Sequence, residues 1–138
     1  MATAQQFEDL GVWQDARALS KLIYSVTKQR EFYRDIDLRR QIRAAAVSAM
    51  SNIAEGFERG TRKEFIHFLN IAKGSNGEVR SQLYVALDQE YISEKQFAEL
   101  KPAAIALSRR IAKFVSYLES CSENTRTRKP VKALNKKT

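Results

Sequence analysis

Residues 41–64 read QIRAAAVSAMSNIAEGFERGTRKE, and the pattern of this segment is the strongest indication of the fold. Its apolar residues recur at steps of three and four, from Ile42 to Phe57, so they share one face of a helix. Gly60 is typical of the residue that follows a helix end, and Thr61 with Glu64 has the spacing of a capping box that begins the next helix. The stretch therefore predicts a helix over about 38–59, a tight turn, and a second helix over about 62–89.

Two other apolar stripes flank this pair of helices. One begins at Trp13 and predicts a helix over about 11–29. The other follows a second capping box, at residues 93–96, and predicts a helix over about 94–121. Pro102 lacks an amide hydrogen, so a kink or a new helix start is expected there. Residues 30–37 have no clear period and are interpreted as a connection, with Asp35 or Asp37 as the N-cap of the next helix.

The four helices and their short connections together predict an all-α fold. The expected architecture is an antiparallel up-down-up-down four-helix bundle over residues 1–121. Residues 122–138 are polar and carry a net charge of +5, and we expect them to form a disordered basic tail.

Composition limits the class of protein. The 138 residues carry a net charge of +8, which favours an acidic partner such as nucleic acid. The single cysteine, Cys121, cannot form an internal disulfide, and no apolar run is long enough for a membrane span. The first residues lack the basic and apolar segments of a signal peptide, so the expected location is the cytoplasm.

Five polar or small residues of the two central helices are candidates for a functional or a structural role. Asn52, Glu55 and Glu78 can be read as a catalytic or metal-binding group. They can also be read as structural groups paired with Arg43 or with a neighbouring subunit, and this second interpretation is favoured because buried polar groups are usually paired. Glycine is unfavourable inside a helix, so a close helix contact is expected at two further positions, Gly56 and Gly74. Gly74 and the nearby Gly77 could also mark a break, but one long helix with a close contact at its centre is favoured.

The sequence offers little for catalysis or metal binding. Glu64 and His67 match half of a di-iron motif, but such a site needs two Glu-x-x-His pairs and the chain has one histidine. We therefore predict no catalytic site, no metal and no cofactor.

The central motif also carries a family resemblance. Its parts are Gln41-Ile42-Arg43, Asn52-Ile53-Ala54-Glu55-Gly56, Arg59, Glu64-Phe65, Phe68-Leu69, Gly74-Ser75 and Glu78. Over about residues 7–118 the chain resembles the four-helix-bundle family named for proteins encoded in intervening sequences of bacterial 23S rRNA genes. The resemblance implies a ring of five identical subunits and no enzymatic activity. The family is similar in shape to the accessory proteins of diversity-generating retroelements, which bind nucleic acid and a reverse transcriptase.

Three groups of basic residues are candidates for phosphate contacts. Each group alone is most simply a solvated surface, but together they favour salt-dependent, sequence-tolerant binding of nucleic acid. Arg17, Lys21 and Lys28 of the first helix add to the basic surface. The predicted contacts are Arg39, Arg40 and Arg43 in the second helix, Arg59, Arg62 and Lys63 around the tight turn, and Arg126, Arg128, Lys129 and Lys132 in the tail.

The favoured function is that of a non-enzymatic, homo-oligomeric accessory protein that binds RNA. The alternative is a scaffold or adaptor that binds another protein and no nucleic acid. An enzyme that uses Glu55 and Glu78 is the least favoured hypothesis.

Overall fold

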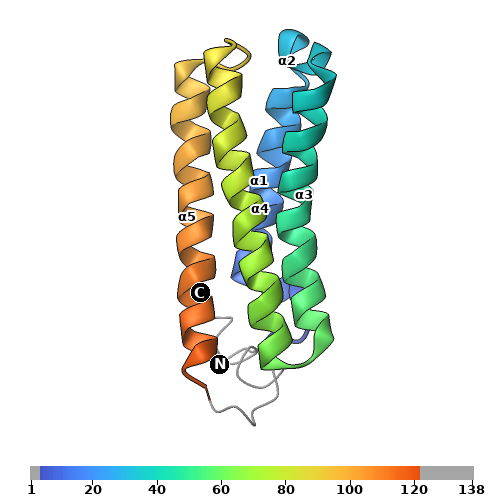
Figure 1. The fold of residues 1–138 in the computed structure, drawn as a ribbon, viewed down its shortest axis with the longest axis vertical. Helices are drawn as coiled ribbons and strands as arrows, with labels where there is room; N and C mark the ends of the chain where they lie inside the picture. Colours follow the sequence, from blue (N-terminus) through green and yellow to red (C-terminus); the bar gives the residue numbers. More distant parts are fainter. Residues whose placement is uncertain (1–3, 122–138) are drawn as a thin grey trace.

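A computed structural model describes residues 4–121, and the regular structure of this part of the chain is entirely helical (Figure 1). This confirms the predicted all-α fold. A single 3-10 turn, η1 (Phe7–Asp9), precedes the α-helices. These are α1 (Gly11–Thr27), α2 (Arg30–Arg34), α3 (Ile36–Arg59), α4 (Arg62–Asp88) and α5 (Glu94–Glu119).

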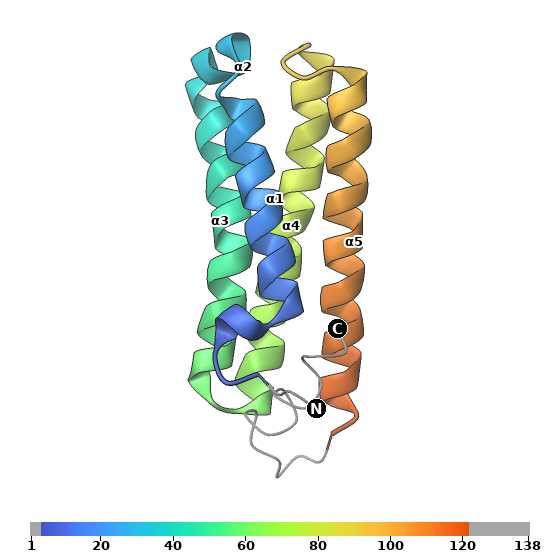
Figure 2. The ribbon, with the colours of Figure 1, turned by 180° about the vertical axis from the view of Figure 1, so that it is seen from behind.

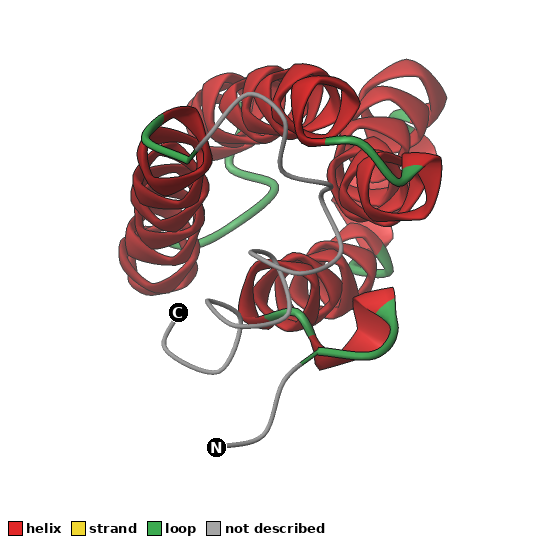
Figure 3. Cartoon of the chain, turned by 90° about the horizontal axis from the view of Figure 1, so that it is seen from below, coloured by secondary structure: helices red, strands yellow, loops and turns green. Residues whose placement is uncertain are grey.

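The four long helices α1, α3, α4 and α5 lie side by side as a bundle, as Figures 1 and 2 show from opposite sides. The α3–α4 turn lies at the lower end of the bundle in Figure 1, whereas α2 and the α4–α5 loop lie at the upper end. Seen from below, the long helices surround a shared interior (Figure 3). The most extensive helix contacts join α3 to α4 and α4 to α5, and α1 packs mainly on α3.

The predicted apolar stripes supply the core. In α3 the predicted stripe is buried throughout, at Leu38, Ile42, Ala45, Ala46, Ala49, Ile53 and Phe57. The stripes of α4 and α5 are buried over most of their length, with Phe97 only half-buried at the start of α5. Burial of such side chains stabilises a domain by about 1.5–3 kcal/mol each, so these faces hold the bundle together.

Aromatic side chains close the core near both ends of the bundle. At the α3–α4 turn, the Phe65 ring packs edge-on against Phe57 and Phe114, with centroid distances of 6.1 and 5.4 Å. Near the opposite end, Phe32 stacks on Tyr91 at 5.4 Å. These contacts join elements far apart in the chain, because Phe32 belongs to α2 and Tyr91 to the α4–α5 loop.

A polar layer crosses the middle of the bundle. Asn76 of α4 is 1% exposed, and its Nδ2 donates to the Ala104 carbonyl at 2.7 Å and to Ser108 Oγ at 2.8 Å in α5. On the other side of α4, Ser75 and Ser48 share a hydrogen bond of 2.9 Å between their hydroxyls. Polar pairs inside an apolar interface favour one register over others, so this layer fixes α4 against both neighbours.

The interpretation of residues 30–37 as a plain connection is wrong. Residues 30–34 form the short helix α2. Its Phe32 side chain is fully buried in the core, and this burial stabilises the helical turn. Five residues are too few to show a helical period in the sequence. Asp35 then caps α3, where its side chain accepts from the Leu38 amide at 3.1 Å, which confirms one of the two expected N-caps.

Helix α5 runs without a break through Pro102, so the expected new helix start is wrong. Pro102 has no amide hydrogen to donate to the carbonyl of Ala98, four residues earlier. Both residues are exposed, so water can solvate that carbonyl instead. The helix begins at the predicted capping box, in which Ser93 and Gln96 each accept from the other's amide. At Thr61 only half of the box forms: Thr61 Oγ1 accepts from the Glu64 amide, but the Glu64 carboxylate bonds the Thr61 hydroxyl.

The two glycines predicted to make close contacts differ. A Cβ on Gly56 would lie 2.8 Å from atoms of both Phe65 and Phe68, so the predicted close approach of α4 is confirmed there. At Gly74 a Cβ would meet no atom within 4 Å, so the expected contact is wrong. The stripe that faces the core includes Ala72, Ser75 and Asn76 instead, and Gly74 lies on the exposed side of α4.

Within residues 4–121, no helix combines the length and the low polarity that a membrane crossing requires.

Candidate nucleic-acid interface

The predicted cations at the start of α3 are largely engaged within the chain. Arg39 donates from Nη1 to the Tyr33 carbonyl, and its guanidinium lies 4.0 Å from the centroid of the Tyr33 ring. Arg43 donates from Nε to Thr27 Oγ1 at 2.8 Å. Arg40 is exposed and has no partner among the described residues.

The cations around the α3–α4 turn are also mostly committed. Arg59 donates to Glu55 at 3.1 Å and lies 3.5 Å from a Glu64 oxygen. Arg62 Nη1 donates to the carbonyls of Leu118 and Cys121, at 3.0 and 2.8 Å, and so caps the C-terminus of α5. These two side chains therefore have structural partners.

Lys63 completes this group and is exposed without a partner in the described part of the chain. The start of α3 and the α3–α4 turn lie at opposite ends of the bundle (Figure 1). At about 1.5 Å per residue, Arg40 and Arg59 are separated by about 28 Å along α3. The two predicted groups therefore do not form one site, and the fold leaves only Arg40 and Lys63 of the six freely available. The predicted tail contacts Arg126, Arg128, Lys129 and Lys132 lie outside the described residues.

The polar motif residues have local partners. Asn52 Nδ2 donates to the Ser48 carbonyl at 2.8 Å and to Ser48 Oγ at 3.0 Å, which attaches it to the polar layer. Glu55 pairs with Arg59, and Glu78 is exposed on α4. Of the two expected partners of these polar residues, Arg43 is not one, because it turns toward α1. Pairing with a neighbouring subunit stays a prediction.

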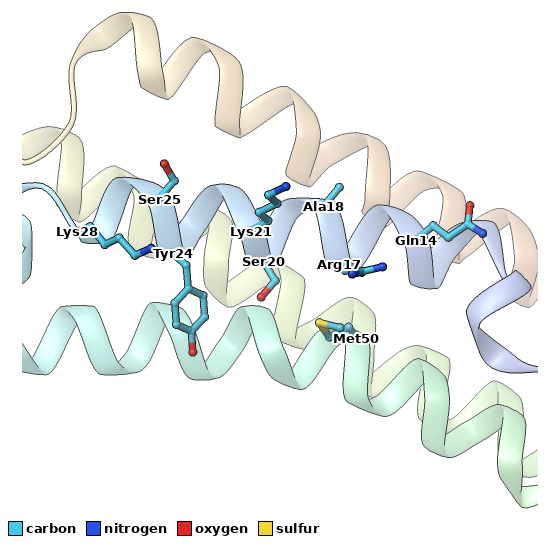
Figure 4. Close-up of a pocket in the computed structure, with 9 residues that line it drawn as sticks. All are labelled: Gln14, Arg17, Ala18, Ser20, Lys21, Tyr24, Ser25, Lys28 and Met50. Atoms are coloured by element: carbon cyan, nitrogen blue, oxygen red, sulfur yellow. The ribbon is translucent and has the colours of Figure 1, made fainter.

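A concave surface on α1 brings together cations that the predicted groups did not include. Figure 4 shows that its side chains come from one face of α1, with Met50 contributed by α3. The groove has a volume of about 920 Å³. Its nine lining residues are Gln14, Arg17, Ala18, Ser20, Lys21, Tyr24, Ser25, Lys28 and Met50. We call this surface the α1 groove.

The α1 groove is basic and contains an aromatic ring. Three of its nine residues are cations, Arg17, Lys21 and Lys28, and none is a carboxylate. With Tyr24 they follow one another at steps of four, three and four, so they lie on one stripe of α1. Arg17 lies 5.8 Å from the centroid of Trp13, while Lys21 and Lys28 are exposed. The stripe offers two to three cations to one extended anion.

The family model for the 23S rRNA-intervening sequence protein matches residues 8–113. The chain belongs to this family. The matched residues include the central motif, both predicted groups of the folded part and the whole α1 groove, whereas the tail lies beyond the match. The resemblance that the central motif indicated is thereby confirmed.

A solved structure supports the fold of this family member. It is the crystal structure of a protein with unknown function from the S23 ribosomal protein family of Bacteroides thetaiotaomicron. The two chains are 19% identical with a TM-score of 0.69, and the match covers 75% of this chain and 97% of the other. At this identity the likeness shows the fold alone. A comparison with curated proteins finds no match.

Within this family member, the predicted half of a di-iron motif is not assembled into a larger cluster. Among residues 4–121, no three side chains of the His, Cys, Asp and Glu types gather closely enough to hold a metal ion. His67 is exposed and packs edge-on against Phe68 at 5.3 Å.

From the sequence, the cations of α1 are expected only to add to the basic surface. Their regular spacing with Tyr24 was the available signal, but the same spacing occurs on many solvated helix faces. Only the packing of α1 against α3 turns that face into a groove.

Proposed function

We propose that this chain is a non-enzymatic accessory protein that binds nucleic acid, RNA foremost, through phosphate contacts in the α1 groove. The observation that carries the proposal is a groove lined by three cations and no carboxylate. Such a surface favours binding of a polyanion such as a nucleic acid, because each phosphate that a cation neutralises releases condensed counterions. The name of the matched family, which refers to 23S rRNA, agrees with an RNA partner.

The predicted contacts divide into two roles under this proposal. Arg40 and Lys63, which are exposed, and the tail residues add sequence-independent attraction between the chain and a nucleic acid. The other four predicted contacts of the folded part have mainly a structural role, because each side chain bonds to a partner within the chain. They are Arg39, Arg43, Arg59 and Arg62.

Fluorescence anisotropy with a labelled RNA tests the proposal. Binding through three phosphate contacts is expected to weaken by about 20- to 40-fold when the salt concentration rises from about 50 to about 200 mM. The double variant Lys21→Ala/Lys28→Ala is expected to bind more weakly. Its salt slope, the change in the logarithm of the binding constant with the logarithm of the salt concentration, is expected to be smaller. The control, Lys73→Ala/Arg80→Ala, removes the same charge from the exposed side of α4 and is expected to bind like the parent. Absence of binding at low salt, or an equal decrease in both variants, would contradict the proposal.

The alternative, a protein scaffold, has one observation in its favour. A shallow groove of about 540 Å³ on α5 is lined mainly by apolar residues, together with Lys101 and Arg109. Lys101 lies 5.5 and 5.9 Å from the ring centroids of Tyr84 and Phe97. If the scaffold function holds, Ile105→Asp abolishes capture of one stoichiometric protein partner, while the α1 variants leave that capture intact.

We also propose that the chain assembles with itself, with a ring of five as the expected form. Exposed apolar side chains on α3 and α4, among them Val47, Ile71 and Val85, support self-association, because a contact between copies would bury them. Sedimentation at micromolar concentration tests this, and a stable species of 15.8 kDa would contradict it.

A further inference from the structure

Tyr24 is the aromatic member of the α1 groove and lies between two of its cations. Tyr24 as a residue is 37% exposed, and in Figure 4 its ring projects from α1 toward α3. Lys21 precedes it by three residues and Lys28 follows it by four, so each lies about one helical turn away on the same stripe.

One face of the Tyr24 ring already carries a cation. The guanidinium carbon of Arg43 lies 4.5 Å from the ring centroid, which is a cation–π distance. Arg43 is held there by its hydrogen bond to the hydroxyl of Thr27. Thr27 is fully buried and donates in turn to the carbonyl of Ile23 at 2.8 Å. The ring and its cation are therefore fixed before any ligand arrives.

A fixed ring that carries a cation over one face and lines a basic groove suits a nucleobase. Bases stack on aromatic side chains, and the stacking is sequence-tolerant because every base has a π-face. Since the ring is already ordered, little conformational entropy is lost when a base stacks on it. The phosphates on either side of that base would then lie toward Lys21 and Lys28.

We propose that the α1 groove binds single-stranded RNA, with one base stacked on the face of Tyr24 opposite Arg43. This inference rests on the proposed function and adds the class of nucleic acid. In a duplex the bases are stacked on each other, so a duplex offers the groove only its phosphates. Unpaired loops of a structured RNA offer both phosphates and a free base.

The test compares a labelled oligoadenylate of about 12 nucleotides with the same strand annealed to its complement. The full chain is expected to bind the single strand more tightly than the duplex at equal salt. Tyr24→Leu is expected to lower the affinity for the single strand by about tenfold and to leave duplex binding unchanged. Tyr24→Phe keeps the ring and serves as the matched control, with binding close to that of the parent. Circular dichroism and urea unfolding check that both variants fold.

The salt slope gives a second readout. Tyr24→Leu removes a stacking contact and no phosphate contact, so the slope for the single strand stays the same while the affinity falls. If single strand and duplex bind alike and Tyr24→Leu changes neither, the inference is wrong and the proposed function stands. If the parent binds neither RNA at low salt, the proposed function itself fails.

Discussion

Gly56 lies against two phenylalanines of α4, and this contact allows a direct test at the residue scale. A methyl group there would come within 2.8 Å of Phe65 Cδ1 and Phe68 Cβ. Phe68 Cβ belongs to the rigid base of its side chain, so the helices themselves would have to shift. Gly56→Ala is therefore expected to lower the free energy of unfolding by about 1–3 kcal/mol, although alanine favours helix.

Gly74→Ala is the matched control for this substitution. Its Cβ would meet nothing within 4 Å, so the higher helix propensity of alanine is expected to raise the free energy of unfolding by up to about 1 kcal/mol. Urea unfolding followed by circular dichroism measures both variants. A Gly56→Ala protein as stable as the parent would show that α3 and α4 do not pack as described.

The hydrogen bond from Tyr91 to Asp35 predicts a pH dependence. Tyr91 Oη donates to Asp35 Oδ2 at 2.9 Å, which raises the pKa of Tyr91, and burial and the negative charge of Asp35 add to the rise. A tyrosine whose pKa is higher in the folded state stabilises the fold fully below its ordinary pKa of about 10. That stabilisation is lost as the pH rises through the raised pKa.

Tyr91→Phe is accordingly expected to unfold more easily than the parent at neutral pH, and the difference should shrink above about pH 10. Urea unfolding at a series of pH values measures it. Tyr84→Phe is the control, because the Tyr84 hydroxyl has no partner in the described part of the chain. A difference that is constant across the whole pH series would mean that the hydrogen bond is not its source.

At the scale of the element, α5 tolerates a proline in its interior. The neighbouring helix α4 anchors α5 through Asn76, whose bond to the Ala104 carbonyl lies just beyond Pro102. Pro102→Ala restores the amide that the exposed Ala98 carbonyl lacks, so it is expected to raise the free energy of unfolding by about 1–3 kcal/mol.

Ala106→Pro supplies the comparison for Pro102→Ala. Ala106 is exposed one turn further along α5, and proline there is expected to destabilise by about 3 kcal/mol. Thermal unfolding measures both changes. If Pro102→Ala destabilises the protein instead, the proline has a favourable role that its exposed position does not indicate.

At the scale of the whole molecule, the charge is divided unevenly. Residues 4–121 carry a net charge of +3, whereas residues 122–138 carry +5. A chain that ends after residue 122 keeps the Leu118 and Cys121 carbonyls that Arg62 caps, so its stability is expected to match that of the full chain.

The same shortened chain separates the tail from the α1 groove in RNA binding. Its affinity is expected to be lower at about 50 mM salt. Its salt slope on a single strand should be smaller by about 0.7 for each phosphate that the tail would otherwise neutralise. Its preference for a single strand over a duplex should persist, because Tyr24 is retained. Disappearance of that preference on truncation would assign it to the tail.

The four long helices, most of the core and the family can be predicted from local patterns in the sequence. Helical spacing and capping patterns are local. The burial of Ile42 and the capping roles of Thr61 and Ser93 can therefore be predicted from their near neighbours in the sequence. Two elements are not predicted in this way, the 3-10 turn η1 and the short helix α2. Helix α2 is set by burial of Phe32 against Tyr91, a contact between residues far apart in the chain.

Which cations are free to meet a ligand depends instead on contacts between distant parts of the chain. Arg62 is 56 and 59 residues away from the carbonyls it caps, and Arg43 is 16 residues from the threonine that holds it. Such partners are chosen by the packing of helices, and no local pattern contains them. The same packing places α3 beside the Arg17–Lys28 face of α1 and so forms the basic groove. A charge count shows how many cations the chain has, whereas their availability depends on what the fold puts beside each one.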